Sequence, residues 1–289
     1  MAGADATRRL PAGAPSPHPL DRVLAARRPS ICGILDVTPD SFVDGGRGTG
    51  LAAAVEHGCA LAADGADLID VGGEPTRPGS PPPTLAEEID RVVPVIEALA
   101  RRVPVPLSVD TSRPEVMRAA VAAGARMIND VRALRAPGAL EAAAECGVPV
   151  CLVHVQRSPG TVQQEPRYRD VVAEVCSVLA ERKRACLAAG IRPEHVVVDP
   201  GFGIGKTLSH DLALLASLDR LGSLGCPIMV GPSRTSVLGQ LPGRAVGDRW
   251  PSSLAAAVIA ARRGAAVLRV HDVAATRDVL AVLEAVDTA

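Results

Sequence analysis

Polar side chains that could do chemistry recur along this 289-residue chain, each placed near the point where a short apolar run ends. In chain order they are Asp36, Asp70 with Glu74, Asp110, Asn129 with Asp130, His154, Asp199, Ser233 with Arg234, and Arg269 with His271. A single acid in such a place is more often a helix cap or a turn former than a ligand-binding group. Their recurrence favours a binding site, because parallel strands would bring them to one rim.

The residue types indicate two kinds of chemistry. Asp110, Asn129 and Asp199 offer acceptors and an amide, which suit a heterocycle with several N–H donors held in a deep pocket. A second set suits an anion such as a phosphate or a carboxylate; it consists of Ser233, Arg234, Arg269 and His271. The residues therefore predict a substrate that joins a flat polar ring to an anionic group.

The stretch from His195 to Thr207 ends in Gly205-Lys206-Thr207, which invites comparison with a nucleotide-binding phosphate loop. That motif requires a glycine five residues before Gly205, and position 200 is proline. We therefore reject a nucleoside triphosphatase and interpret Asp199 as an acid at the end of a buried strand, since three β-branched residues precede it.

Short apolar runs must position these groups, and helical patterns rich in alanine separate them. The runs are Ile31–Val37, Asp67–Gly73, Pro106–Thr111, Met127–Val131, Pro149–Val155, His195–Pro200, Pro227–Ser233 and Ala265–Asp272. The helices are expected near 50–64, 84–101, 113–123, 138–146, 168–189, 209–224, 248–263 and 273–287. This alternation predicts a (β/α)8 TIM barrel rather than an open doubly wound sheet, which has fewer strands and a dinucleotide fingerprint that is absent here.

Composition limits the classes of function. The chain carries 31 basic and 32 acidic residues, and this near balance predicts no nucleic-acid surface. Only 1% of the residues are aromatic, so a flat ligand would stack on an arginine and not on an aromatic ring. Its seven cysteines show no CxxC or zinc spacing, which indicates reduced thiols and a cytoplasmic location. No apolar run approaches the ~18 residues of a membrane span.

We divide the chain into residues 1–30 and one barrel domain, residues 31–289. The first part is rich in Ala, Pro and Arg and contains no apolar core of a secretory signal. We expect a disordered tail there in preference to an organelle transit peptide.

Several motifs together resemble those of dihydropteroate synthases. They are GILDVTPDSF from Gly33, DVGGEPTRPG from Asp70, SVDT from Ser108, IND from Ile128, DPGFGIGKT from Asp199, GPSRTS from Gly231 and RVHD from Arg269. The resemblance runs in order from about Ile31 to Val286. It implies a barrel enzyme, usually a homodimer, that joins 6-hydroxymethyl-7,8-dihydropterin diphosphate to 4-aminobenzoate and releases diphosphate with Mg²⁺.

The resemblance also implies roles for individual residues. The catalytic set would be Asp110, Asp199, Arg269 and Arg77, with Asp40 and Asp44 helping to close the site. The pterin ring would bind Asp110, Asn129 and Asp199 and stack on Arg269. The diphosphate would bind Thr76, Arg269 and His271, and Asp36 would bind the metal. The 4-aminobenzoate would meet Ser236, Thr235, Ile204 and Arg234.

Four positions depart from the family's usual pattern. Asp36 replaces an asparagine, Pro75 a serine and Ile204 an aromatic residue that flanks the aminobenzoate ring. Thr235 replaces a lysine that contacts the pterin carbonyl and borders the aminobenzoate site. Loss of one charge-assisted hydrogen bond, about 1.5–3 kcal/mol, would slow turnover about ten- to a hundredfold. The pterin pocket is therefore expected to be kept better than the side that binds the second substrate.

Three hypotheses follow. The first is an active synthase, and the second is a paralogue that binds a pterin with weak or no condensing activity or with another amine acceptor, as a partner or regulator; Asp36 and Thr235 favour the second. The third is a pterin barrel that transfers a methyl group from methyltetrahydrofolate to a corrinoid protein. The diphosphate-type residues Thr76, Arg269 and His271 argue against the third.

Overall fold

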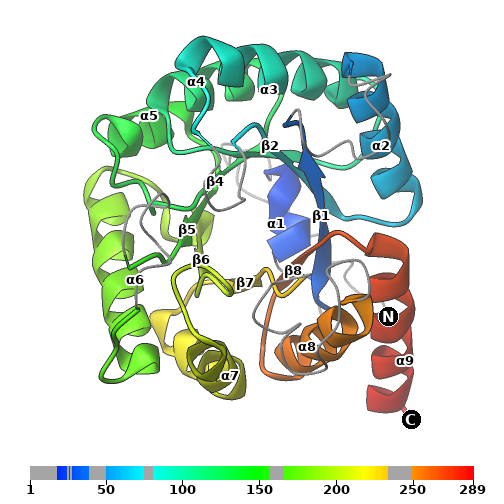
Figure 1. Cartoon of the computed structure of the whole chain (residues 1–289), viewed down its shortest axis with the longest axis vertical. Coiled ribbons are helices and arrows are strands. Elements are labelled where there is room, and N and C mark those ends of the chain that lie inside the picture. The colour runs from blue at the N-terminus through cyan, green and yellow to red at the C-terminus, as the bar shows by residue number, and fades with distance from the viewer. Residues whose placement is uncertain are drawn as a thin grey trace, which may run out of the picture.

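Eight parallel strands form a barrel with helices around it (Figure 1). The computed structural model describes residues 18–24, 26, 28–38, 50–74, 81–156, 166–233 and 249–289. The strands are β1 (Ser30–Asp36), β2 (Leu68–Gly72), β3 (Leu107–Asp110), β4 (Met127–Asp130), β5 (Val150–Val153), β6 (Val196–Asp199), β7 (Met229–Val230) and β8 (Val267–Val270). Neighbours pair in parallel from β6 through β1 to β8 and β7, and a single parallel bridge between Val198 and Ile228 joins β6 to the run before β7. The predicted barrel and all eight predicted strands are confirmed.

The described helices lie where the sequence predicts them, except for a short additional helix within residues 1–30 and an earlier end of the helix expected over 209–224. They are α1 (Pro19–Leu24), α2 (Leu51–Ala63), α3 (Leu85–Ala100), α4 (Pro114–Ala123), α5 (Ala139–Cys146), α6 (Val171–Ala188), α7 (Leu208–Ala216), α8 (Trp250–Arg262) and α9 (Val273–Asp287). Thr84 and Glu87 form the predicted capping box at the start of α3. The helix expected over 209–224 ends at Ala216 and continues as a 3₁₀ segment, whose three-residue period lets Leu218 and Leu221 both be fully buried.

Successive side chains of each strand point to opposite sides of the barrel wall. Outward side chains such as Ile31, Leu35 and Ile69 belong to the large core formed with the helices. A second apolar cluster, which we call the barrel interior, contains Leu20, Val23, Cys32, Leu68, Met127, Cys151, Val153, Val197, Met229 and Val267. These residues come mostly from the first halves of the strands, so the interior is closed by apolar packing at that end and polar groups occupy the other.

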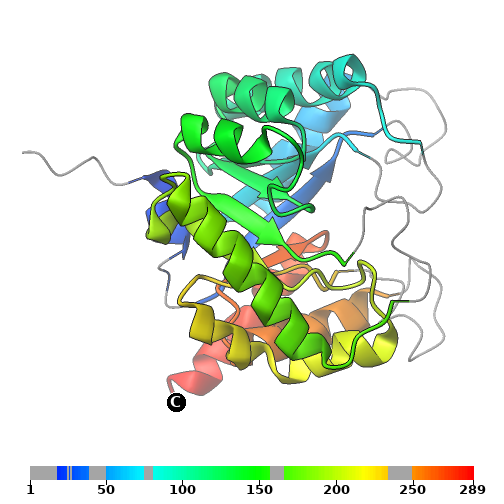
Figure 2. The ribbon, with the colours of Figure 1, turned by 90° about the vertical axis from the view of Figure 1, so that its left-hand side faces the viewer.

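Helix α1 differs from the prediction of a disordered tail over residues 1–30, in the part of that segment that the structure describes. Leu20 is completely buried, and Leu20 and Val23 pack into the barrel interior beside Leu68 and Val267, the first residues of β2 and β8. Figure 2 shows α1 at the end of the barrel opposite the tips of the strands. Six helical residues carry too little pattern to be recognised in sequence, and burial against the barrel makes this helix stable.

Two composition-based expectations bear on location. All seven cysteines are free, and four of them are buried. Over the described residues, no helix combines the length and the apolar character needed to cross a membrane.

Candidate active site at the carboxyl ends of the strands

Arg269 connects two acids that come from different strands of the barrel. Its Nε donates to Asp70 Oδ2 (2.6 Å), and its Nη2 donates to Asp110 Oδ2 (2.8 Å). The Asp70 side chain is 1% exposed, whereas those of Arg269 and Asp110 are 18% and 21% exposed. One guanidinium is thus held by two carboxylates, with its remaining surface open to the mouth of the barrel.

Asn129 extends this group to β4. Its Nδ2 donates to Asp70 Oδ2 (2.9 Å), so one carboxylate oxygen accepts from both Arg269 and Asn129. Asn129 Oδ1, Asp70 Oδ1 and the hydroxyl of Ser108 are buried without a hydrogen-bond partner among the described residues. Buried polar atoms of this kind are costly unless a ligand or water satisfies them, so they indicate where N–H donors of a ligand would bind.

Asp199 ends β6 and faces the same group. Its Oδ1 accepts from the backbone N–H of Gly201 (2.6 Å), which fixes the orientation of the carboxylate. Burial raises the pKa of Asp199 to about 6, while the Gly201 hydrogen bond and the charges of Arg269 and Lys206 oppose that rise. The carboxylate is therefore ionised at neutral pH and can accept hydrogen bonds.

Asp36 and Asp110 lie close to one another across β2. A Cβ built on Gly72, which separates them, would lie 3.6 Å from Asp36 Oδ1 and 3.9 Å from Asp110 Oδ2. Burial raises the pKa of Asp110 above its ordinary value, the ion pair with Arg269 opposes that rise, and the nearby carboxylates of Asp70 and Asp36 add to it. Glycine at position 72 therefore leaves space between two acids whose repulsion favours a cation or a proton between them.

The loop after β6 is built around a buried ammonium. Lys206 Nζ donates to the backbone oxygens of Gly201 (2.8 Å), Ile204 (3.2 Å) and His154 (3.3 Å). Ile204 is partly buried and packs against the barrel interior. Lys206 thus belongs to the wall of the site and does not point into it.

Two further strand ends meet near β7 and β8. Ser233 Oγ lies 2.9 Å from His271 Nδ1, and the backbone N–H of His271 donates to Ser233 Oγ (3.1 Å). This pair joins the loops after β7 and β8 on the rim that carries Arg269.

Some strand-end groups have structural roles instead. Asp130 accepts from the backbone N–H groups of Arg132 and Leu134 (both 2.8 Å) and from the Ser112 hydroxyl, so it forms the turn after β4. His154 is 2% exposed, and burial together with Lys206 lowers its pKa to about 3, which keeps its ring neutral. For these two residues the simpler turn-forming or core interpretation is correct.

The structure brings together much of the predicted site. Asp36, Asp110 and Asp199 are the last residues of their strands, and Asn129 and Arg269 are the last but one. Ile204 and His271 lie in the loops that follow β6 and β8. The remaining predicted site residues, namely Arg77, Thr76, Arg234, Thr235 and Ser236, lie outside the described residues, as do Asp40, Asp44 and Pro75.

Asp70 is the residue of this group to which the sequence assigned no individual role. It lies in the middle of β2, where an apolar environment is expected, and it accepts hydrogen bonds from both Asn129 and Arg269. The signal was available, because an acid two residues before Gly72 on a buried strand points to the same side as Asp110 and Asn129.

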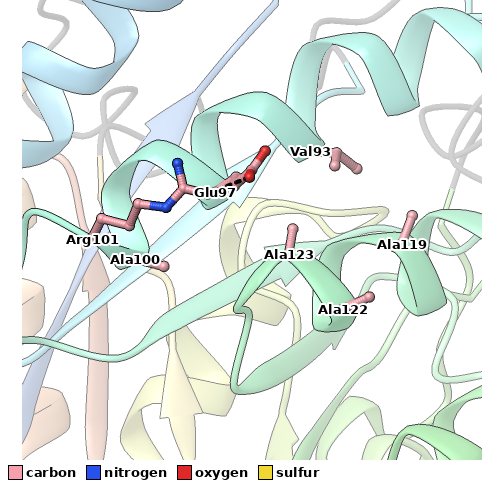
Figure 3. Close-up of a pocket in the computed structure, with 7 residues that line it drawn as sticks. All are labelled: Val93, Glu97, Ala100, Arg101, Ala119, Ala122 and Ala123. Atoms are coloured by element: carbon pink, nitrogen blue, oxygen red, sulfur yellow. Dashed lines mark hydrogen bonds and ion pairs between the residues drawn. The ribbon is translucent and has the colours of Figure 1, made fainter.

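A hollow between α3 and α4 lies away from this chemistry (Figure 3). It is lined by Val93 and Glu97 of α3 and by alanines such as Ala119 and Ala122 of α4. The lining offers one ion pair, between Glu97 and Arg101, which is largely exposed. We therefore place the active site at the barrel mouth and not in this hollow.

Comparisons with known proteins identify the family of the chain. The model of a family described as "pterin binding enzyme" matches residues 32–271. The dihydropteroate synthase of Escherichia coli K12 is 51% identical over 257 residues, covering 89% of this chain and 91% of that protein. The enzyme of Haemophilus influenzae is 44% identical, covering 89% of this chain and 94% of that protein.

Solved structures are similar over the same region. Dihydropteroate synthase of Xanthomonas albilineans with 4-aminobenzoic acid has a TM-score of 0.87 and 54% identity, covering 91% of this chain and 94% of that one. The same enzyme in complex with 7,8-dihydropteroate has a TM-score of 0.83 and 52% identity, covering 91% and 95%. With its barrel, its acids around Arg269 and these relatives, the chain belongs to the dihydropteroate synthase family of pterin-binding enzymes.

Proposed function

We infer that this chain is a transferase that condenses 6-hydroxymethyl-7,8-dihydropterin diphosphate with 4-aminobenzoate, yielding 7,8-dihydropteroate and diphosphate. The observation that carries this inference is the set of unpaired oxygens on Asp70 and Asn129 beside Arg269, inside a family whose relatives bear this activity in their names. A pterin ring offers the N–H donors that these oxygens lack. The Xanthomonas relative binds both 4-aminobenzoic acid and the product 7,8-dihydropteroate.

The residues of the site act through position and charge. Asp110, Asn129 and Asp199 hold the ring edge, and the exposed face of Arg269 lies against the ring, since few aromatics are present to stack on it. The bond between the pterin methylene carbon and the diphosphate oxygen breaks, and the oxygen keeps the electron pair. The carboxylates stabilise the positive charge that develops on the pterin methylene. The amine of 4-aminobenzoate then attacks this carbon and loses a proton.

Asp36 is the residue we propose as a ligand of Mg²⁺. Among the described residues, no group of three or more His, Cys, Asp or Glu side chains could hold a metal ion. The positive observation is that Asp36 Oδ1 and Asp110 Oδ2 both lie near Gly72, since Mg²⁺ is commonly bound by one or two carboxylates together with substrate phosphates. When bound, Mg²⁺ neutralises charge on the leaving diphosphate, and the second carboxylate at position 110 increases the need for it.

The test of the proposed function uses purified protein with dihydropterin diphosphate, Mg²⁺ and 4-aminobenzoate, and measures both diphosphate and dihydropteroate. Stoichiometric formation of the two products above an enzyme-free control is the expected result. Tight pterin binding without dihydropteroate would instead favour the second hypothesis, a paralogue with weak condensing activity or another amine acceptor. Complementation of a synthase-deficient strain asks the same question in cells.

Thr235→Lys probes the departure on the side of the second substrate. Thr235 lies outside the described residues, so the expectation comes from the resemblance alone. Restoring an ammonium should raise kcat/KM about tenfold or more, because a charge-assisted hydrogen bond is worth about 1.5–3 kcal/mol. An unchanged or lower rate would mean that the site is adapted to threonine.

Two further properties belong to the same proposal. We expect a homodimer, as the family resemblance implies, which sedimentation velocity will test. We also expect a cytoplasmic location, which the seven free thiols support. Fractionation of cells that carry the tagged protein tests that expectation.

A further inference from the structure

Lys206 is an unusual residue for this chain. The chain has 31 lysine and arginine residues, and only Lys183 and Lys206 are lysines. Lys206 is 7% exposed, and its Nζ donates to three backbone oxygens, those of His154, Gly201 and Ile204. An ammonium has three N–H donors on one atom, so all three are used by the protein itself.

The three acceptors belong to two separate segments. His154 follows β5, while Gly201 and Ile204 form the turn after β6. The approach is so close that a Cβ on Gly201, which has a φ of +70°, would lie 2.1 Å from the His154 oxygen. The ammonium therefore links the segments that follow two neighbouring strands, β5 and β6.

Other contacts hold the rest of the turn. The backbone N–H of Gly203 donates to Asp211 Oδ2 (3.0 Å), and Asp211 is completely buried on α7. The Tyr168 hydroxyl lies 3.4 Å from the Gly205 oxygen as a weak donor. The position of Asp199 is fixed without the ammonium, because β6 pairs with β5. The backbone N–H of His154 also donates to the backbone oxygen of Asp199 (2.8 Å).

Ile204 has fewer anchors than Asp199. Its backbone N–H donates to the Gly201 oxygen (3.3 Å), its backbone oxygen accepts from Lys206, and its side chain packs on the barrel interior. We propose that Lys206 is a positioning residue that holds Ile204 at the wall of the site that receives the aromatic amine, and that Lys206 contacts neither substrate. This proposal rests on the proposed function for its substrate, while the geometry of the loop can be tested alone.

The geometry also explains why lysine, and not arginine, occupies this position. The three oxygens converge on one atom, which suits a compact ammonium, whereas a guanidinium spreads its donors over a planar fork. Lys206 also does not replace the lysine that the family usually has at position 235, because all three of its N–H donors already bind backbone oxygens.

The loop should respond to pH. The groups that face Lys206 are Asp199 on β6, Asp211 on α7 and His154 after β5, with His210 nearby. Burial lowers the pKa of Lys206 to about 8, and the charges of Asp211 and Asp199 oppose that change. A neutral amine has only two N–H donors, so above that pH one of the three oxygens loses its partner.

Lys206→Met tests the proposal, with Lys183→Met as the matched control. Lys183 donates to the Leu224 backbone oxygen (2.6 Å) on the outside of the barrel. We expect Lys206→Met to raise the KM for 4-aminobenzoate about tenfold or more, as loss of charge-assisted hydrogen bonds does, while the KM for the pterin diphosphate changes less than about threefold. The control should change neither constant.

Amide hydrogen exchange gives a readout independent of catalysis. Exchange of amides 201–205 should accelerate in Lys206→Met and not in Lys183→Met, and it should accelerate in the wild type above about pH 8, after correction for the intrinsic rate. In the wild type, the KM for 4-aminobenzoate should rise over the same range.

Equal effects on both KM values, or unchanged exchange, would overturn the proposal. If the wild type makes no dihydropteroate, the proposed function fails while the exchange measurements still decide the role of Lys206. If Lys206→Met does not fold, the pH series on the wild type decides it.

Discussion

Asp70 shows how one side chain sets the geometry of several others. Its Oδ2 accepts from Arg269 and from Asn129, and Arg269 in turn donates to Asp110. The orientation of the guanidinium plane therefore depends on two acids, of which only Asp110 is partly exposed. In the proposed function a pterin ring stacks on that plane, and we therefore expect Asp70 to act on the ring through Arg269 as well as directly.

Asp70→Asn should lower kcat/KM for the pterin diphosphate about ten- to a hundredfold, because it removes a charge-assisted hydrogen bond worth about 1.5–3 kcal/mol. Steady-state kinetics provide the measurement, and circular dichroism checks that the fold is retained. Asp219→Asn is the control, because Asp219 is 65% exposed in a pair with Arg263 and should be neutral. Activity of Asp70→Asn within twofold of the wild type would contradict this role.

Asp199 gives a prediction about pH. Its pKa is raised by burial to about 6 from an ordinary 3.8, so between these values the folded protein binds more protons than the unfolded chain. Stability from this group therefore falls as pH rises from about 4 to about 6, by roughly 2–3 kcal/mol. Urea unfolding of the wild type and Asp199→Asn over this range measures it: the wild type should lose stability relative to the variant. A constant difference would show that burial does not raise this pKa.

At the scale of elements, the barrel is closed differently at its two ends. Helix α1 covers the end where the strands begin, with Leu20 completely buried against the barrel interior. The other end carries the loops and the polar groups of the site. This division separates residues that stabilise the fold from those that bind substrate, as barrels generally do.

Leu20→Ala should lower the free energy of unfolding by about 2–5 kcal/mol, because it leaves a cavity in a fully packed interior. Turnover at saturating substrate should stay the same, since α1 lies at the opposite end from Arg269. Urea denaturation measures the loss. Leu187→Ala on α6 is the control, because Leu187 is 37% exposed and should cost much less. Equal losses in the two variants would contradict the role of α1.

At the scale of the whole molecule, the barrel has a weak seam. Strands β1 and β2 pair over five residues, whereas β7 has only two residues and meets β6 through the single bridge of Val198 and Ile228. Fewer ladder hydrogen bonds and a shorter strand leave less to break when the barrel opens locally.

Native-state hydrogen exchange should therefore show lower protection at Val198 and Val230 than at Leu35 and Val71. The expected order follows from the pairing, because the first two amides lie at the seam and the last two lie in the longest pair. Exchange measured in mild denaturant would separate local opening from global unfolding. Uniform protection around the barrel would indicate that it opens only as a unit.

The sequence by itself determined the class of fold and placed several residues of the candidate site at the ends of strands. Strands and helices alternate with clear punctuation, and residues such as Asp110 and Asp199 stand at strand ends, where barrel chemistry occurs. These signals are local or periodic, so they can be recognised from the amino-acid sequence alone. The motifs also carried the resemblance to the family, which the comparisons confirm.

Only the tertiary structure decided which of these residues act together. The links from Asp70 to Arg269 and Asn129 join positions 199 and 59 residues apart, and no short-range pattern encodes such pairs. Helix α1 was missed because its stability comes from burial of Leu20 and not from propensity. In sequence, Lys206 resembles the lysine of a phosphate-binding motif. The structure shows instead that its ammonium donates to three backbone oxygens of the protein itself. Contacts between distant segments arise when the chain closes into a barrel, and for that reason they had to be seen in three dimensions.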